Sequence, residues 1–287
     1  MISLLAVLML SAAPVDLEAE TRAYHQQRLT ALEAEGWLNL VGLLWLAPGD
    51  NRAGSAKDNA LVFPKGAPAK LGTFFWGKDA VTFEPVPGVT VTERGKPFPG
   101  GALAVEPDSK TPTTLEVGTL SFFPIRRGEK LGIRIKDSQA PARQAFTDIP
   151  MFPANPTWRV MGKLEAQDPP GKLAVPNVLG SIDEVESPGT VVFSVGGKTY
   201  RLTPTATAKD PDYFFVFSDL TNRDTTYGAG RFLHTGKADA KGNMLLDFNH
   251  AYNPPCAFSA FATCPLPPKQ NRIPARIEAG EKRAGHP

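Results

Sequence analysis

Short apolar stretches separated by turn residues fill most of this chain. Apolar and polar residues tend to alternate within them, and proline, glycine or charged residues bound them, a pattern typical of half-buried strands. We expect strands at 37–46, 60–63, 72–76, 81–83, 89–92, 114–125, 130–136, 158–165, 189–195, 198–203, 213–218, 231–234 and 244–249. Strands at such close spacing predict a mainly β fold with antiparallel sandwich or barrel-like sheets. We expect one hairpin to turn at Arg126-Arg127-Gly128 and another to join 231–234 to 244–249.

One segment near the start has a helical pattern instead. Residues 16–35 begin at Asp16, which suits an N-cap, and end before Gly36, which suits the C′ position. Apolar residues recur at helical spacing, namely Leu17, Tyr24, Ala31 and Leu32. We therefore expect one N-terminal amphipathic helix that packs across a sheet or barrel mouth.

Residues 1–13 have the features of an export signal. An apolar run of about nine residues precedes Ser11-Ala12-Ala13, and small residues suit cleavage by a signal peptidase. The run is too short to cross a bilayer as a helix, and no later segment is long and apolar enough. We expect cleavage near Ala13 and a periplasmic or secreted protein without a transmembrane segment. The alternative is a short buried N-terminal strand.

The composition fits a folded domain and argues against a nucleic-acid-binding protein. The chain has 287 residues, of which 42% are hydrophobic, and a formal net charge of +2. That charge is small for a nucleic-acid-binding domain, and the hydrophobic content is high for a disordered chain. The 26 glycines and 28 prolines are an excess of turn formers, which favours a β-rich fold. We expect one β-rich domain over 14–287, with a possible division into two halves near 149–156.

The densest polar chemistry lies between Asp247 and Pro268. This stretch contains both cysteines of the chain, Cys256 and Cys264. An even number of cysteines in an exported protein suggests a disulfide, which would contribute about 2.5 kcal/mol for so short a loop. A catalytic cysteine with His250 and Asp247 is an alternative. The spacing fits no standard zinc pattern, so we expect no metal and no cofactor.

The second predicted hairpin places an arginine opposite a carboxylate. If its strands pair, Arg231 falls near Asp247, and an arginine fork on a carboxylate makes a strong pair. The pair could only fix the strand register, or Asp247 could orient Arg231 toward an anionic group on a ligand. Asp219 lies in a loop rich in oxygen atoms and glycine, where it could cap a turn or line a pocket. The candidate catalytic residues are Asp247, Asp219 and Arg231.

Four neighbouring residues are candidates for ligand binding. Tyr227, Asn249, Tyr252 and Asn253 offer hydroxyl and amide groups on a backbone stiffened by proline. Asn253 precedes a proline, which favours an extended or turn conformation. It could therefore satisfy buried backbone groups instead of a ligand.

Several motifs carry a family resemblance. They are Gly-Trp-Leu-x-Leu-x-Gly-Leu-x-Trp-Leu at 36–46, Tyr-Gly-x-Gly-Arg-Phe-Leu at 227–233, Leu-Asp-Phe-Asn at 246–249, Ala-Tyr-Asn-Pro-Pro-Cys-Ala-Phe at 251–258 and Thr-Cys-Pro-Leu-Pro-Pro at 263–268. Together they resemble a bacterial and archaeal family catalogued as domain of unknown function 1684. His250 stands where that family has arginine more often, which weakens a role for this histidine. The resemblance implies a shared fold and a shared site, and it implies no activity.

These features are compatible with three kinds of function. The first is binding of a small polar or anionic ligand in a pocket near Arg231 and Asp247. The second is a hydrolase in which Asp247 or Asp219 is the general base and Arg231 stabilises charge. The third is a structural motif that locks the C-terminal segment onto the sheet. A fully buried cluster whose members satisfy one another's hydrogen bonds would favour the structural motif. A pocket beside these residues would favour ligand binding or hydrolysis.

Overall fold

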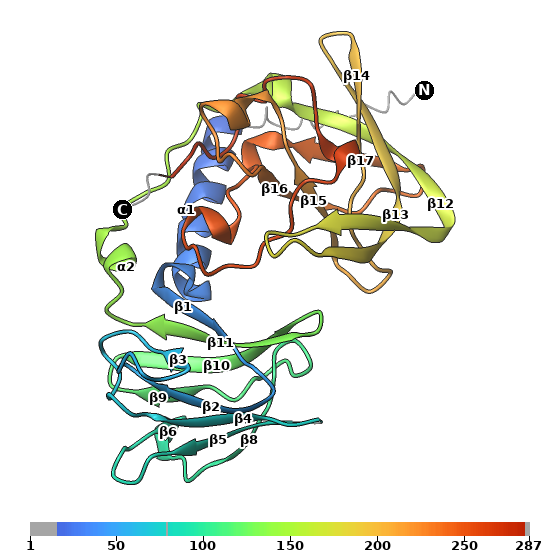
Figure 1. Cartoon of the computed structure of the whole chain (residues 1–287). Coiled ribbons are helices and arrows are strands. Elements are labelled where there is room, and N and C mark those ends of the chain that lie inside the picture. Colours follow the sequence, from blue (N-terminus) through green and yellow to red (C-terminus); the bar gives the residue numbers. More distant parts are fainter. Residues whose placement is uncertain (1–15, 79, 285–287) are drawn as a thin grey trace, which may run out of the picture.

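The computed structural model describes residues 16–78 and 80–284. The predicted signal peptide, residues 1–13, lies outside them. The protein is mainly β, with 42% of its residues in strands and 16% in helices, and its sheets are antiparallel apart from one short parallel pairing. The expected fold class is therefore confirmed (Figure 1).

The elements follow one another in the order helix, sandwich, long-stranded sheet. The strands of the first half are β1 (Leu40–Trp45), β2 (Gly49–Gly54), β3 (Leu61–Val62), β4 (Gly72–Trp76), β5 (Val81–Pro85), β6 (Thr92–Glu93), β7 (Lys96–Pro97), β8 (Gly101–Leu103), β9 (Leu115–Val117), β10 (Leu120–Arg127) and β11 (Lys130–Asp137). Those of the second half are β12 (Arg159–Pro176), β13 (Ile182–Val195), β14 (Lys198–Leu202), β15 (Asp212–Phe217), β16 (Arg231–Gly236) and β17 (Asn243–Asp247). The helices are α1 (Leu17–Glu35) and α2 (Pro141–Ala145), with short 3-10 helices η1 (Trp37–Asn39), η2 (Pro156–Trp158), η3 (Leu220–Arg223), η4 (Phe248–His250), η5 (Pro255–Ala257) and η6 (Lys269–Asn271).

Helix α1 forms where the sequence predicts it. The Asp16 side chain accepts a hydrogen bond from the Ala19 amide at 3.1 Å, and Gly36 ends the helix in the left-handed conformation at φ 69°. The helix is first in the chain, yet it lies along the second half of the molecule (Figure 1). Arg28 on α1, for example, donates a hydrogen bond to the Asn253 carbonyl at 3.2 Å. No helix in the described part of the chain combines the length and hydropathy needed to cross a membrane.

The first half is a β-sandwich with its own core. A six-stranded sheet, β1-β11-β10-β9-β6-β7, faces a five-stranded sheet, β3-β2-β4-β5-β8. Phe74, Phe83 and Phe122 are fully buried between them, with ring centroids 4.4 Å apart for Phe74 and Phe83 and 5.8 Å for Phe83 and Phe122. The predicted hairpin at Arg126-Arg127-Gly128 is confirmed, since β10 pairs with β11 up to Arg127 and Lys130.

The second half is built on a four-stranded sheet of order β14-β13-β12-β17 and the separate ribbon β15-β16. Phe217 and Trp158 each contact Phe248 edge to face, at centroid distances of 5.5 and 5.8 Å. This core buries the inner faces of the sheet and the ribbon together with part of the C-terminal segment, such as Ile277 and Ala279. The two halves meet at β10 and β11, where Arg127 donates a hydrogen bond to the Thr263 hydroxyl at 3.0 Å.

The second predicted hairpin is wrong. Strand β16 pairs with β15, so that Arg231 lies opposite Phe217. Strand β17 pairs with the long strand β12, so that Asp247 lies opposite Arg159. Alternation of apolar and polar residues alone does not say which neighbour completes a ladder. The pairing is decided by the long β12, which gives β17 a partner that is remote in sequence.

Candidate functional site

Arg231 and Asp219 form an ion pair in the interior of the second half. Both side chains are fully buried, and the Arg231 guanidinium donates to the Asp219 carboxylate at 2.8 Å. The same guanidinium donates to the carbonyls of Ile277 at 2.8 Å and Ala279 at 2.5 Å. Burial lowers the pKa of Arg231, and the nearby Asp219 carboxylate opposes that effect. The pair therefore clamps the C-terminal segment onto β16.

Asp219 has further partners that hold its position. It caps η3, accepting hydrogen bonds from the Thr221 amide at 2.8 Å and the Thr221 hydroxyl at 2.6 Å. The Ile277 amide donates to it at 3.2 Å. Together with the hydrogen bond from Arg231, these contacts occupy both oxygens of the Asp219 carboxylate with donors from the protein.

Asp247 has no contact with Arg231, so the predicted ion pair between them is not formed. Asp247 instead lies 3.3 Å from Arg159 on the adjacent strand. It accepts hydrogen bonds from the Asn249 amide at 3.0 Å and the Asn249 side chain at 2.8 Å. Asn249 in turn is fully buried and accepts a hydrogen bond from the Asn155 amide at 2.8 Å. This chain of contacts joins η4 to the segment before β12.

Of the three remaining candidates for ligand binding, two make hydrogen bonds within the protein and one lines a cavity. Asn253 is fully buried and donates to the Lys282 carbonyl at 2.8 Å. The Tyr227 hydroxyl donates to the Cys256 carbonyl at 3.0 Å. Tyr252, by contrast, lines a cavity of about 760 Å³.

The two cysteines are free thiols in the structure, so it does not contain the expected disulfide. They are nevertheless close, since the Cys256 amide lies 3.1 Å from the Cys264 sulfur. The Cys256 thiol is directed to the Ala262 carbonyl at 3.5 Å. A hydrogen bond from the Cys264 thiol lowers the pKa of Cys256.

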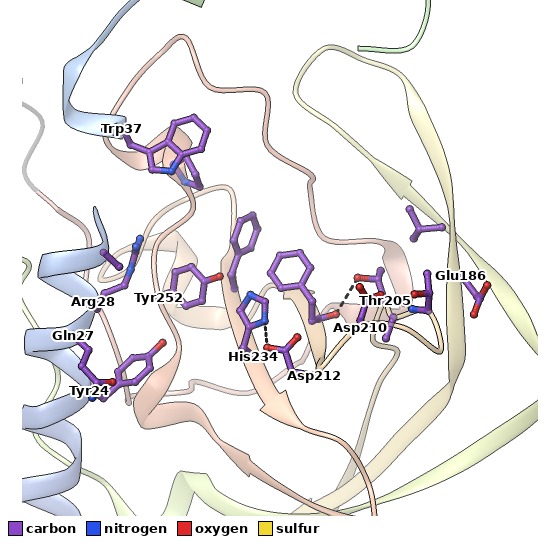
Figure 2. Close-up of a pocket in the computed structure, with 17 residues that line it drawn as sticks. Tyr24, Gln27, Arg28, Trp37, Glu186, Thr205, Asp210, Asp212, His234 and Tyr252 are labelled. Atoms are coloured by element: carbon purple, nitrogen blue, oxygen red, sulfur yellow. Dashed lines mark hydrogen bonds and ion pairs between the residues drawn. The ribbon is translucent and has the colours of Figure 1, made fainter. Parts of the chain in front are cut away.

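A cavity of about 760 Å³ lies between α1, the ribbon β15-β16 and strand β13 (Figure 2). Its volume is in the range of sites for small organic molecules. Aromatic rings supply much of the wall, from Tyr24 on α1, Trp37 on η1, Phe214 on β15, Phe232 and His234 on β16, and Tyr252 after η4. Residues from five separate parts of the chain therefore make one aromatic surface.

An aspartate–histidine pair stands at the centre of this cavity (Figure 2). Asp212 and His234 lie on the adjacent strands β15 and β16, and the Asp212 carboxylate is 2.8 Å from His234 Nδ1. The imidazole stacks on Phe214, with ring centroids 4.7 Å apart, and on Tyr252 at 6.0 Å. The carboxylate and the two rings fix the orientation of the imidazole and engage Nδ1. Nε2 is then the nitrogen left for a ligand.

The two ends of the cavity differ in charge. Glu186 and Asp210 lie at the end away from α1 (Figure 2). A hydrogen bond from the Thr207 amide, 2.6 Å long, lowers the pKa of Asp210 and keeps it ionised at neutral pH. At the other end Arg28 is 3.3 Å from the buried carboxylate of Glu281 and lies 4.6 Å above the Tyr252 ring.

The sequence pattern did not reveal the Asp212–His234 pair. Asp212 directly precedes one predicted strand, 213–218, and His234 ends another, 231–234. The two residues meet because β15 pairs with β16, whereas the sequence predicted that the strand at 231–234 would pair with the strand at 244–249. The contribution of α1 depends on tertiary packing alone, since Tyr24 was expected only as part of an apolar stripe.

Comparison with known proteins identifies the C-terminal part of the chain. Residues 144–282 match the family described as "Protein of unknown function (DUF1684)". This part of the chain belongs to that family. The match confirms the expected resemblance, and the residues of the cavity on β13, β15 and β16 lie within it. No protein with a curated description matches the chain.

Several solved structures are similar to parts of the chain. An uncharacterised protein of Haloarcula marismortui, solved by solution NMR, is 28% identical with a TM-score of 0.41, over 49% of this chain and 78% of that one. The FhaA FHA domain, solved in a complex, and an FHA domain from work on phosphothreonine-dependent interactions are each 14% identical with TM-scores of 0.23. They cover 33% of this chain and 97% and 92% of their own. Superpositions at these scores carry no functional argument.

Proposed function

We propose that the aromatic cavity binds a small organic molecule with a flat apolar body and a positively charged, hydrogen-bond-donating group. The observation that supports this most is the Asp212–His234 pair set among aromatic rings in a cavity of about 760 Å³. Aromatic faces attract both apolar groups and cations. The acidic side chains at the centre and far end supply the complementary charge.

The charge balance of the lining favours a cation over an anion. Glu186, Asp210 and Asp212 are the acidic lining residues, and Arg28 is the lining arginine. The charge of Arg28 is offset by Glu281, which is 1% exposed and outside the cavity lining. The sequence-based hypothesis of an anionic ligand relied on Arg231, whose fully buried guanidinium is directed to Asp219 and backbone carbonyls.

The charge preference can be tested with a matched pair of probes. Isothermal titration with phenethylamine should give saturable binding, and 2-phenylethanol, which has the same ring without the charge, should bind at least about tenfold more weakly. Asp212→Asn should weaken phenethylamine binding by about tenfold, because the cation loses a carboxylate partner. Glu165→Gln is the control, since Glu165 pairs with Arg201 outside the cavity. Equal affinities for the two probes, or an unchanged affinity in Asp212→Asn, would refute the proposal.

The Asp212–His234 pair also favours a second candidate function, hydrolysis. A carboxylate on Nδ1 leaves Nε2 of His234 able to take a proton from a water molecule as that water attacks a carbonyl carbon. p-Nitrophenyl acetate is a suitable probe, and its hydrolysis should fall at least about tenfold in His234→Gln. A rate that is equal in the wild type and the variant would exclude this function for His234.

We further propose that the protein is exported. The support is the apolar run and the small residues at 11–13, as in a signal peptide. N-terminal sequencing of the protein made with its full leader in a bacterial host should then begin close to Pro14. Retention of Met1 and recovery in the cytosolic fraction would refute export.

A further inference from the structure

A second cavity, of about 640 Å³, lies on the second half between η3, the turn 228–230 and the segment 266–274. Gly230, next to the lining residue Ala229, has φ 104°. A Cβ atom there would lie 2.5 Å from a ring carbon of Pro267 and 2.6 Å from the Phe217 carbonyl. The absence of a side chain at Gly230 therefore lets Pro267, which lines the cavity, pack against this turn.

Two arginines of this half have side chains without a partner, and both line this cavity. Arg223 and Arg272 are exposed, and among the described residues neither side chain makes a hydrogen bond or an ion pair. Every other arginine from 159 to 283 is engaged by a carboxylate or a carbonyl, namely Arg159, Arg201, Arg231, Arg276 and Arg283. Both unpaired arginines therefore line the same cavity.

The protein leaves the charge of this cavity uncompensated. Asp219 is the acidic lining residue, and its charge is offset by the buried Arg231 at 2.8 Å. Asp224, which follows η3 in the chain, is bound by Arg276 at 2.9 Å. A ligand that carries negative charge would be attracted by both arginines and could accept hydrogen bonds from their guanidinium groups.

We propose that this cavity is a binding site for a small organic anion, with a phosphate or carboxylate group held by Arg223 and Arg272. Guanidinium groups bind both anions through paired N–H donors. The cavity exceeds the volume of an inorganic ion, and Leu266, Pro267 and Ile273 give it apolar walls. The ligand therefore has an apolar body next to its anionic group. This site is separate from the aromatic cavity and does not depend on the function proposed for it.

Phenyl phosphate is the probe, titrated into the full protein by calorimetry at low salt. We expect one-to-one binding that weakens at least about tenfold in Arg223→Gln and in Arg272→Gln, because each loses a charged donor pair. Arg201→Gln is the matched control, since Arg201 is an exposed arginine of the same half that pairs with Glu165 and does not line this cavity. Its affinity for phenyl phosphate should equal that of the wild type. Both arginines are exposed, so the melting temperatures of their variants should stay unchanged and exclude unfolding as the cause.

Two further titrations show which anionic group is preferred and whether the two cavities bind separately. Phenylacetate replaces the phosphate by a carboxylate, and the tighter of the two probes identifies the preferred anion. Phenethylamine should not compete with phenyl phosphate, because its proposed site is the aromatic cavity. The proposal is refuted by no binding of either anion at millimolar concentration. It is equally refuted by an affinity that changes as much in Arg201→Gln as in Arg223→Gln and Arg272→Gln.

Discussion

At the scale of single residues, the polar side chains of the C-terminal motifs are mostly engaged within the protein. Arg231, Asp219 and Asn249 have buried side chains whose hydrogen bonds go to neighbouring strands, caps and the terminal segment. Buried polar groups need such partners, because each one left unpaired costs free energy. We infer that these residues hold the C-terminal segment in place, and that ligands are bound by the more exposed Asp212, His234 and the two free arginines.

The buried ion pair should show strong coupling between its partners. Arg231→Met leaves the Asp219 carboxylate buried without its cation, and the free energy of unfolding should fall by about 3–5 kcal/mol. The double variant Arg231→Met with Asp219→Asn should be destabilised by less than the sum of the single variants, because no unpaired charge remains. Urea denaturation of the four proteins measures the coupling. Additive losses would show that the pair acts as two independent side chains.

Glu281 should make stability depend on pH. It is 1% exposed, and burial raises its pKa above the ordinary value of 4.5. The folded protein therefore holds this proton to higher pH than the unfolded chain, so the contribution of Glu281 to stability is complete below pH 4.5 and is lost as pH rises through the folded pKa. The glutamine in Glu281→Gln cannot ionise, so the stability of this variant should not fall in this way. The free energy of unfolding of the variant minus that of the wild type should therefore increase as pH rises above 4.5. Unfolding curves at several pH values test this, and a constant difference would contradict it.

At the scale of elements, polar contacts hold α1 against the second half. Arg28 pairs with Glu281, Glu20 pairs with Arg159, and Leu32 is a fully buried apolar residue of the helix. The amphipathic pattern predicted that a helix forms and where it ends. It did not predict that the helix would face a charged surface and supply one wall of a cavity, because the partner side chains come from β12 and the C-terminal segment.

The turn before β16 gives an element-scale prediction. Gly230→Ala places a Cβ in a left-handed conformation and against Pro267, and should cost about 2 kcal/mol or more of unfolding free energy. Gly228→Ala is the control, since its nearest neighbour would be 3.8 Å away and its φ is not in the left-handed region. This control should change stability by less than about 1 kcal/mol. Similar losses for the two variants would show that the close contact at 230 is unimportant.

At the scale of the whole molecule, the protein has separate cores in its two halves. Phe83 belongs to the sandwich core, and the aromatic cavity is built by α1, η1 and the second half. Phe83→Ala should therefore lower the unfolding free energy by about 3–5 kcal/mol and leave phenethylamine affinity unchanged at temperatures where the protein stays folded. Calorimetric titration below the melting transition measures both. A parallel loss of affinity would show that the sandwich supports the cavity directly.

The sequence by itself determined the β-rich class, the helix with its cap and end, most strand positions and the family resemblance of the C-terminal motifs. These features depend on local patterns, since alternation, capping residues and glycine positions act within a few residues along the chain. Only the tertiary structure decided that β16 pairs with β15, that Arg231 binds Asp219, and that Asp212 and His234 meet inside a cavity walled by α1. Each of these contacts joins segments whose pairing depends on the free energy of the entire fold, and such competition between distant partners leaves no signal in a local pattern.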